Sequence, residues 1–386
     1  MKIYFNKPYS TGRETDYVKE AISSGQTAGN GPFTRRCNEL LKRSFGFGKC
    51  LLTTSCTDAL EMCALLTDIK PGDEIIVPAY TFVSTALAFA RQGAVIVFAD
   101  SRYDNPCIDE EKIEKLITSK TKAIVPVHYG GIACEMDRIM EIADAHNLLV
   151  IEDAAHAFGS RYKGRLLGTI GHLGCFSFHE TKIIHCGEGG MLSVNDERFI
   201  NRAEIIWEKG TNRCDFHRGK VNKYEWIDTG SSFLMSDISA AFLYAQLLEA
   251  ENIFNKKKIH WEFYYKSLKE IENKGFIKFS IIPADSETNY SGFHLITRNP
   301  QERARLLNIL NKAEIQALTH YLDLGESPYI KQNQPGRKSY QINTNSRKYQ
   351  DTLLRLPLYN DLTFDQISEI ADLIKNFYDC EIVRPS

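Results

Sequence analysis

The sequence predicts an α/β fold built on a largely parallel sheet with helices on both faces. Short apolar segments of strand length alternate with helix-length periodic segments between residues 48 and 195. The expected strands are 50–53, 74–77, 94–98, 123–127 and 148–151, and the expected helices between them include 57–66, 82–91 and 136–146. This alternation is typical of parallel sheets whose crossovers are helices. Ligands are therefore expected at the carboxyl ends of the strands.

The chain changes character after residue 235. A helical run over 236–268 predicts a long connector into a smaller and more charged α/β lobe. We therefore expect a large domain over 1–250 and a small C-terminal domain over 251–386, the latter with a strand at 292–296 and helices at 301–313 and 364–377. The segment 327–346 is rich in Pro, Gly, Asn and Gln, which predicts a mobile loop.

Composition argues against several classes of partner. The 386 residues are 43% hydrophobic, enough for a sizeable core, and carry a formal charge of −2 without a polybasic segment. Neither nucleic acid nor a membrane is therefore expected as a partner. The ten cysteines are scattered, so reduced thiols in a cytoplasmic protein are expected. No apolar stretch approaches the length of a membrane-spanning helix, and no metal site is predicted.

One lysine lies in the most informative motif of the chain. Lys182 follows the apolar run 175–178 and precedes a glycine-rich turn at 187–190. A desolvated lysine can act as an amine nucleophile. Upstream, Asp153 follows the strand at 148–151 and places a carboxylate at its carboxyl end. The pair predicts pyridoxal phosphate, with Lys182 forming an imine with its aldehyde and Asp153 keeping its pyridine nitrogen protonated.

Simpler interpretations of both residues exist. A lysine usually snorkels to the surface, and an Asp after a strand often caps the following helix. A similar ambiguity applies to the expected turn before the helix at 57–66. There, the backbone N–H groups of Cys56 and Thr57, with the Thr57 hydroxyl, are placed to bind a phosphate at the positive end of the helix. A Ser/Thr helix cap alone would also account for that turn.

Five segments together resemble one protein family. They are Ser55-Cys56-Thr57, 78–86, 151–156, 176–182 and 187–190. In this order they resemble the DegT-type nucleotide-sugar aminotransferases of PLP fold type I, and the resemblance extends from residue 3 to the Leu-Arg-Leu-Pro-Leu segment at 354–358. It implies a large domain with a mostly parallel seven-stranded sheet flanked by helices, and a small C-terminal α/β domain. Lysine at position 182 favours the aminotransferases over the sugar dehydratases, which carry histidine there.

The resemblance also implies cofactor contacts. Ser177 corresponds to a phosphate ligand, Phe82 to an aromatic ring that stacks on the pyridine ring, and His156 to a residue that contacts the pyridine O3′. Relatives are homodimers in which an Asn reaches the phosphate of the partner subunit's cofactor. Leu234 occupies that region here, so Ser231 and Ser232 are predicted to make the contact instead.

Substrate residues are implied by the same resemblance. They are Asn30, His179, Arg213, His320 and Tyr321, although a solvated loop position explains a charged side chain equally well. The segments 126–137, 208–213 and 230–237 look most like the branch that aminates C4 of a dTDP-4-keto-6-deoxyhexose with L-glutamate. The expected product is dTDP-4-amino-4,6-dideoxygalactose for a bacterial surface polysaccharide. Open alternatives are amination at C3, a gluco product, a PLP-dependent dehydratase, and a non-catalytic PLP-binding module.

Overall fold

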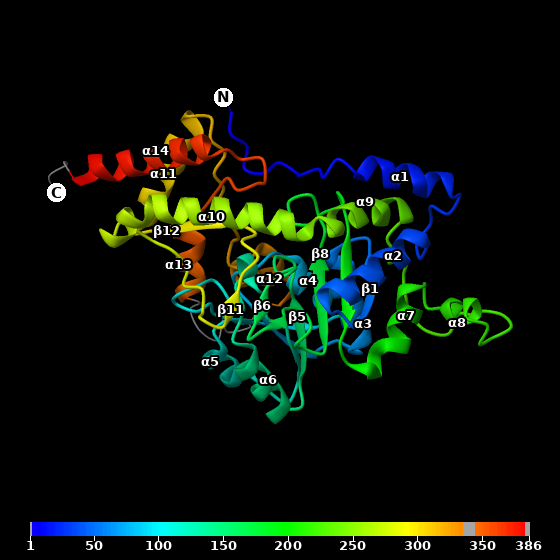
Figure 1. Ribbon diagram of the computed structural model, residues 1–386. Helices are drawn as coiled ribbons and strands as arrows, with labels where there is room; N and C mark the ends of the chain where they lie inside the picture. Colours follow the sequence, from blue (N-terminus) through cyan, green and yellow to red (C-terminus); the bar gives the residue numbers. More distant parts are fainter. Residues whose placement is uncertain (1, 335–343, 383–386) are drawn as a thin grey trace.

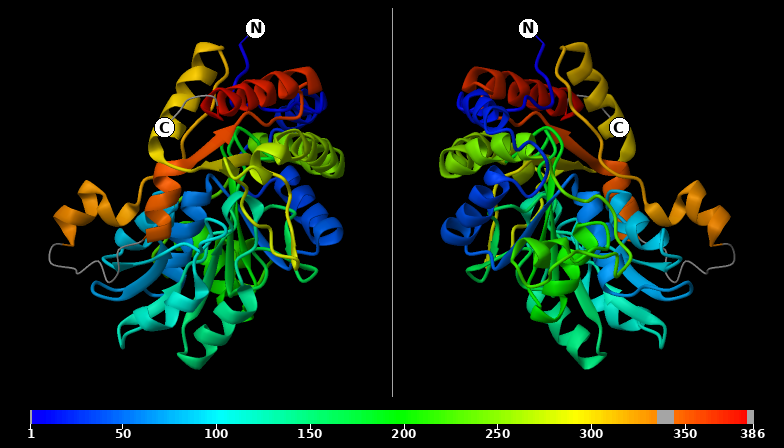
Figure 2. Two further views of the ribbon diagram at one scale, coloured as in Figure 1. Left: turned by 90° about the vertical axis from the view of Figure 1, so that its left-hand side faces the viewer. Right: turned by 90° about the vertical axis from the view of Figure 1, so that its right-hand side faces the viewer.

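The computed structural model describes residues 2–334 and 344–382. Two lobes are visible in Figure 1, a large lobe around a central sheet and a smaller lobe that contains α11, α14 and the N-terminal segment. Figure 2 shows from two further sides that the small lobe lies against one end of the large one. The long helix α10 (Ala250–Asn273) runs along the boundary between them.

The large lobe contains the predicted seven-stranded sheet. Its strands, in spatial order, are β1 (Lys49–Thr53), β9 (Gly190–Val194), β8 (Leu173–Ser177), β5 (Leu149–Asp153), β4 (Thr121–Ile124), β2 (Glu74–Pro78) and β3 (Val95–Ala99). Only β9 runs antiparallel to its neighbours β1 and β8. The mostly parallel sheet expected from the sequence is therefore confirmed.

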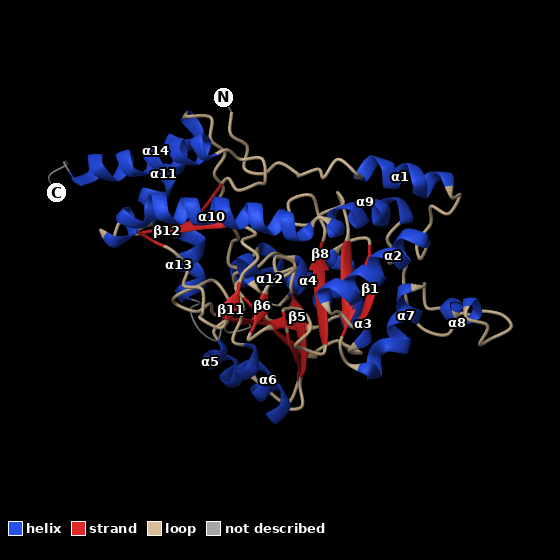
Figure 3. Cartoon of the chain, viewed as in Figure 1, coloured by secondary structure: helices blue, strands red, loops and turns tan. Residues whose placement is uncertain are grey.

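Both faces of this sheet are covered by helices, as Figure 3 shows. Successive strand residues point to opposite faces, so Leu51 joins the core beneath one layer of helices and Leu52 joins the other. The first layer contains α3 (Cys56–Leu66), α4 (Ser84–Ala90) and α7 (Ile200–Trp207). The second contains α2 (Pro32–Leu40), α6 (Met136–Ala145) and α9 (Asp237–Leu248). Near-continuous apolar strands are what burial on both faces requires.

The small lobe is built on an antiparallel sheet in the order β10 (Ile277–Lys278), β12 (Phe293–Thr297) and β13 (Leu353–Leu356). Helices α11 (Pro300–Lys312) and α14 (Phe364–Ile382) pack on it. Its core also includes Ile3, whose backbone N–H donates to the Glu314 carbonyl at 2.9 Å. The N-terminal segment thus packs with the C-terminal lobe, while the division at residue 250 stays a prediction.

The remaining elements connect these parts. They are α1 (Glu14–Ser23), α5 (Glu110–Ile113), α8 (Arg213–His217), α12 (Pro328–Asn333), α13 (Thr344–Thr352), and a small sheet of β11 (Ser286–Glu287), β6 (Arg161–Tyr162) and β7 (Arg165–Leu166). The expected loop at 327–346 contains α12 and the start of α13. The helix α12 forms there because Ser327 caps a helix that begins with a proline. Residues 335–343 of that segment lie outside the described residues. No helix in the described ranges is long and apolar enough to cross a membrane.

Candidate active site

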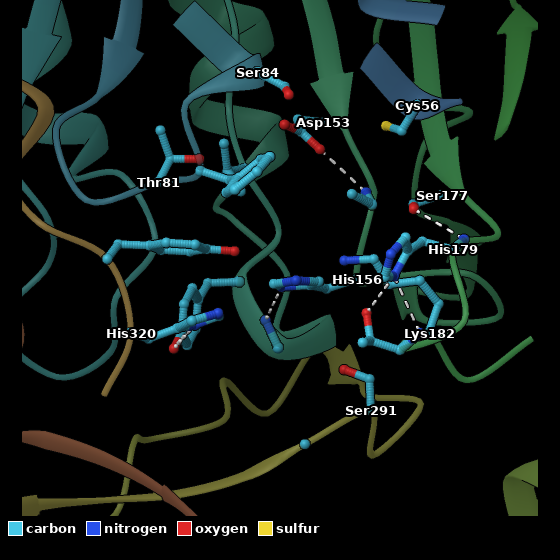
Figure 4. Close-up of a pocket in the computed structure, with 18 of the residues that line it drawn as sticks. Cys56, Thr81, Ser84, Asp153, His156, Ser177, His179, Lys182, Ser291 and His320 are labelled. Atoms are coloured by element: carbon cyan, nitrogen blue, oxygen red, sulfur yellow. Dashed lines mark hydrogen bonds between the residues drawn. The ribbon is translucent and has the colours of Figure 1, made fainter. Parts of the chain in front are cut away.

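A cavity of about 730 Å³ opens at the carboxyl ends of β5 and β8, between the two lobes. Its size is typical of a small-molecule site. Figure 4 shows Asp153 and Cys56 at one end and Ser291 at the opposite end, with His320 and His179 on two sides. The large lobe supplies Lys182, Asp153 and His156, and the small lobe supplies part of the opposite wall. This is the location expected for a ligand in an α/β sheet.

Lys182 is held in the turn that follows β8. Its backbone N–H donates to the His179 carbonyl at 2.9 Å, and the N–H of Phe178 donates to Gly189 at 2.8 Å, which closes the loop around it. Burial is the main cause that lowers the pKa of the Lys182 amine to about 8, and the nearby cation of Arg355 contributes to this lowering. About a tenth of the amine is therefore neutral at pH 7, far more than for a solvated lysine, and the neutral form is the one that a nucleophile or proton acceptor requires.

Asp153 ends β5 with its carboxylate buried beside the cavity. The Thr85 hydroxyl donates to Oδ2 at 2.7 Å, and the Ala155 backbone N–H donates to Oδ1 at 3.1 Å. Burial raises the pKa of Asp153, while these two hydrogen bonds and the charge of Lys182 oppose the rise. Each carboxylate oxygen accepts more than one hydrogen bond, so this side chain remains able to bind a protonated ring nitrogen.

The turn before α3 fits a phosphate group. The Ser55 hydroxyl accepts from the Asp58 backbone N–H at 3.0 Å and caps the helix. Cys56, Thr57 and Ser177 line the cavity beside this positive helix end. The Thr57 hydroxyl lies 2.8 Å from the Ser84 hydroxyl. The helix-cap interpretation of the sequence is thus correct for Ser55, and it leaves Cys56 and Thr57 facing the cavity.

Glycine at position 190 allows the backbone to come close to this turn. A Cβ atom at Gly190 would lie 2.3 Å from the Ser55 carbonyl carbon and 2.4 Å from the Cys56 nitrogen. Any side chain there would displace the backbone of the turn. The glycine-rich segment after Lys182 therefore shapes the anion site in the turn between β1 and α3.

Phe82 and His156 supply the two contacts expected for the ring of a cofactor. The Phe82 ring is 56% exposed and lines the cavity, although an apolar ring is usually buried. The Gly130 backbone N–H donates to Nδ1 of His156 at 3.3 Å. Burial holds the pKa of His156 well below its usual range. The ring is therefore neutral with its proton on Nε2, which makes Nε2 a hydrogen-bond donor.

Three of the predicted substrate residues line the same cavity, namely His179, His320 and Tyr321. His320 lies 2.7 Å from the Tyr129 hydroxyl through Nδ1, and its pKa is lowered by burial. The Tyr321 ring stacks on His320 with centroids 3.8 Å apart. The backbone of Tyr321 has φ of 25°, an unusual value for a bulky residue, and its ring contacts that of Tyr80 on the large lobe with centroids 5.6 Å apart.

The other predicted contacts are not among the residues that line the described cavity. They are Asn30, Arg213, Ser231 and Ser232. Arg213 begins the exposed helix α8, which projects from the large lobe in Figure 1. Ser232 forms a β-bridge with Glu208. The sequence assigned Ser231 and Ser232 to the partner subunit's cofactor, and their roles stay predictions.

Sequence reasoning missed several residues of the site, of which three bear on its chemistry. Thr85 orients Asp153, and His294 and Arg355 line the small-lobe wall. Arg355 carried a recognisable signal, because it is the one charged residue in the apolar strand 353–356. Thr85 carried none, because its partner lies 68 residues away in the chain.

Comparisons with known proteins agree with this site. The sequence model of the DegT/DnrJ/EryC1/StrS aminotransferase family matches residues 8–375. The chain is 30% identical to GDP-perosamine synthase of Escherichia coli O157:H7 over 373 residues, which cover 96% of this chain and 97% of that one. It is also 30% identical to the spore coat polysaccharide biosynthesis protein SpsC of Bacillus subtilis over 382 residues, covering 96% of each.

A similar solved structure identifies the cofactor. A protein of Streptococcus pneumoniae described as a sugar aminotransferase superposes with a TM-score of 0.88 at 25% identity, covering 98% of this chain and 99% of that one. It was solved in PLP and PMP forms. The lysine, the buried carboxylate, the exposed aromatic ring and the anion site of this cavity fit the same group. The sequence-based prediction of pyridoxal phosphate as the cofactor is confirmed.

Proposed function

This chain belongs to the DegT/DnrJ/EryC1/StrS aminotransferase family, and from that premise we propose that it aminates C4 of a dTDP-4-keto-6-deoxyhexose. The amino donor is L-glutamate and the product is dTDP-4-amino-4,6-dideoxygalactose for a bacterial surface polysaccharide. The enzyme acts as a cytoplasmic homodimer.

The observation that carries the reaction type is the placement of Lys182 and Asp153 in one cavity. When bound, pyridoxal phosphate supplies an aldehyde that takes up an amino group and a ring that accepts electrons. The Asp153 carboxylate holds the proton on the ring nitrogen. Lys182 Nζ removes the proton from Cα of the donor, and its lowered pKa matches that role.

The other cavity residues orient the cofactor and exclude water. With the cofactor bound, Phe82 would cover one face of its ring, and His156 would donate from Nε2 to its ring oxygen. Cys56, Thr57 and Ser177 would hold its phosphate at the start of α3. His179, His320 and Tyr321 line the remaining space, where the sugar binds.

Sequence motifs support the choice of substrate. The segments 126–137, 208–213 and 230–237 resemble the C4-aminating branch, and a relative is named for spore coat polysaccharide biosynthesis. A GDP-linked keto sugar is the second candidate. Two relatives are named GDP-perosamine synthase, the one from E. coli and one from Caulobacter vibrioides at 34% identity.

We assign the predicted residues outside the cavity to the site of the partner subunit. Asn30, Arg213, Ser231 and Ser232 then contact the substrate and cofactor phosphate of the other protomer, as a closed two-fold dimer allows for both sites. Sedimentation of the PLP-loaded protein should give a dimer. A fully active monomer would contradict the shared site.

The substrate assignment is tested by product analysis. The PLP-loaded protein is incubated with L-glutamate and dTDP-4-keto-6-deoxyglucose, and in parallel with the GDP-linked 4-keto-6-deoxymannose. NMR of the dTDP product should show nitrogen at C4 with the small H3–H4 coupling of an axial amine. Turnover of the GDP sugar alone would favour the second candidate, and a large H3–H4 coupling would indicate the gluco product.

A further inference from the structure

Arg355 projects from the small lobe into the active-site cavity. It lies on β13 between Leu354 and Leu356, which are buried in the small-lobe core. Alternation along the strand therefore directs Arg355 to the opposite face, where it lines the cavity. Its backbone is fixed by two hydrogen bonds with Leu318, at 2.8 and 3.0 Å. The guanidinium is thus carried by a rigid strand.

The contacts of this guanidinium leave most of its donors free. Nη1 donates to Nε2 of His320 at 3.0 Å, and the guanidinium carbon lies 4.7 Å from the centroid of the Phe5 ring. Among residues 2–334 and 344–382, no carboxylate forms an ion pair with it. The His320 contact orients the group without neutralising it, because burial keeps the pKa of His320 low and its ring uncharged.

The described groups around the Arg355 guanidinium provide no negative charge to balance it. His294 and His156 are also kept neutral, since burial lowers the pKa of His294 to about 3 and that of His156 well below its usual range. The acids that line the cavity are Asp153 and Glu188, and neither forms an ion pair with Arg355. A partly buried cation without an anion is unfavourable, so an anionic group of a ligand would complete this wall.

Three anionic groups could meet Arg355, namely the cofactor phosphate, the diphosphate of the sugar nucleotide and the α-carboxylate of the amino donor, and its position favours one of them. The start of α3 on the large lobe would hold the cofactor phosphate, through Cys56, Thr57 and Ser177. In a nucleotide 4-keto sugar, the diphosphate is attached to C1, across the ring from the reacting C4. In an amino acid donor, the α-carboxylate is attached directly to the reacting Cα. Arg355 and Lys182 line the same cavity. The guanidinium bonds to His320, whose ring centroid lies 6.0 Å from that of His156, which places the guanidinium near the reacting atoms.

We propose that Arg355 binds the α-carboxylate of the amino donor, with His320 holding the guanidinium in place. The inference rests on the proposed use of an amino acid donor. The planar guanidinium matches a carboxylate through two parallel hydrogen bonds, which an ammonium cannot reproduce. Binding at Cα also orients the donor so that its Cα proton faces Lys182.

The test compares donors that differ only in one carboxylate. The first half-reaction is measured without sugar, from the absorbance of the bound cofactor, for L-glutamate, its α-amide L-isoglutamine and its γ-amide L-glutamine. In the wild type, loss of the α-carboxylate should lower the rate constant at low donor concentration about 100-fold. In Arg355→Met, glutamate and glutamine should slow about 100-fold while isoglutamine changes little. Arg355→Lys should recover only part of the preference for glutamate over isoglutamine.

Arg43→Met is the control, because Arg43 is exposed and, within the described part of the chain, its one ion pair is with Glu39 on the surface. It should keep the wild-type preference. Equal use of glutamate and isoglutamine by the wild type would overturn the proposal without any variant. So would an equal loss for both donors in Arg355→Met, or a loss confined to donors with a free γ-carboxylate.

Failure of the donor assignment gives a different result. If the wild type releases no 2-oxoglutarate from L-glutamate, the proposed donor is wrong. The same comparison then uses the α-amino acid that does react and its α-amide, because every such donor carries the α-carboxylate. Arg355 is tested in either case.

Discussion

Two adjacent carboxylates on β5, those of Glu152 and Asp153, face opposite sides of the sheet. One stabilises the fold and the other faces the cavity. Glu152 is fully buried and accepts four hydrogen bonds, from Nε2 of His128 and from the backbone N–H groups of Gly168, Ile170 and Gly171, at 2.6 to 2.9 Å. Asp153 accepts only two, and it lines the cavity. The hydrogen-bonding capacity of the Glu152 carboxylate is filled by groups of the protein itself, whereas the Asp153 carboxylate can still bind a ligand.

The surroundings of the two residues explain the difference. Nδ1 of His128 accepts from the Cys134 backbone N–H at 3.2 Å, so its proton is on Nε2 and points to Glu152. Glu152 therefore ties the turn at 168–171 to the sheet. On the other face, α4 brings a single hydroxyl to Asp153. A buried acid thus indicates a ligand site only when its hydrogen bonds are incomplete.

Replacing Asp153 should produce the largest effect on catalysis. Asp153→Asn keeps the shape but removes the charge that holds a proton on the ring nitrogen, so kcat should fall about 100-fold to 1,000-fold. The thermal midpoint of the protein should change little. Turnover within a few-fold of wild type, at full cofactor loading, would contradict the role of Asp153.

The matched change on the other face should invert this pattern. Glu152→Gln turns one acceptor oxygen into a donor that faces backbone N–H groups, and the free energy of unfolding should fall by about 3 kcal/mol. The measurement is chemical denaturation of the PLP-loaded protein, together with kcat per folded subunit, which should stay within a few-fold of wild type. A stable variant with lost activity would mean that the two acids do not differ as described.

A smaller effect is expected from the residue that orients Asp153. Thr85→Val keeps the volume but removes the hydroxyl that donates to Oδ2, and loss of one such hydrogen bond should lower kcat about tenfold. Thr85→Ser restores the hydroxyl and should recover most of the rate. If serine and valine behave alike, packing rather than the hydrogen bond accounts for the change.

The smallest effect concerns pH. Only the neutral Lys182 amine reacts with the cofactor aldehyde, and its pKa lies at about 8 in the cofactor-free protein. The rate of PLP incorporation should therefore rise with pH up to that value and level off above it. In Asp153→Asn the midpoint should fall, since the carboxylate that favours the ammonium form is gone, whereas Glu152→Gln should leave it in place. A midpoint near that of a solvated lysine in all three proteins would contradict the burial of Lys182.

Much of the fold was predictable because its signals are local. The strands β1, β2, β3 and β5 lie within two residues of the expected segments, since each is a short apolar run between turn residues. The positions of Lys182 and Asp153 in one cavity followed from motifs near strand ends, whereas those of Phe82 and His156 followed from the resemblance to the family. The hydroxyl of Thr85 and the reach of Arg355 depend on contacts between distant segments. The roles of Asn30, Arg213, Ser231 and Ser232 stay predictions, because the proposal made for them involves a second subunit, which the periodicity of one chain does not describe.

The most direct test of the central claim is the first half-reaction alone. PLP-loaded protein is mixed with L-glutamate in the absence of sugar, and 2-oxoglutarate and the cofactor absorbance are followed together. The wild type should release one equivalent of 2-oxoglutarate per subunit as the visible absorbance of the cofactor disappears, and Lys182→Ala should release none above background. No 2-oxoglutarate from the wild type, or release by Lys182→Ala at the wild-type rate, would contradict transamination by Lys182 in this cavity.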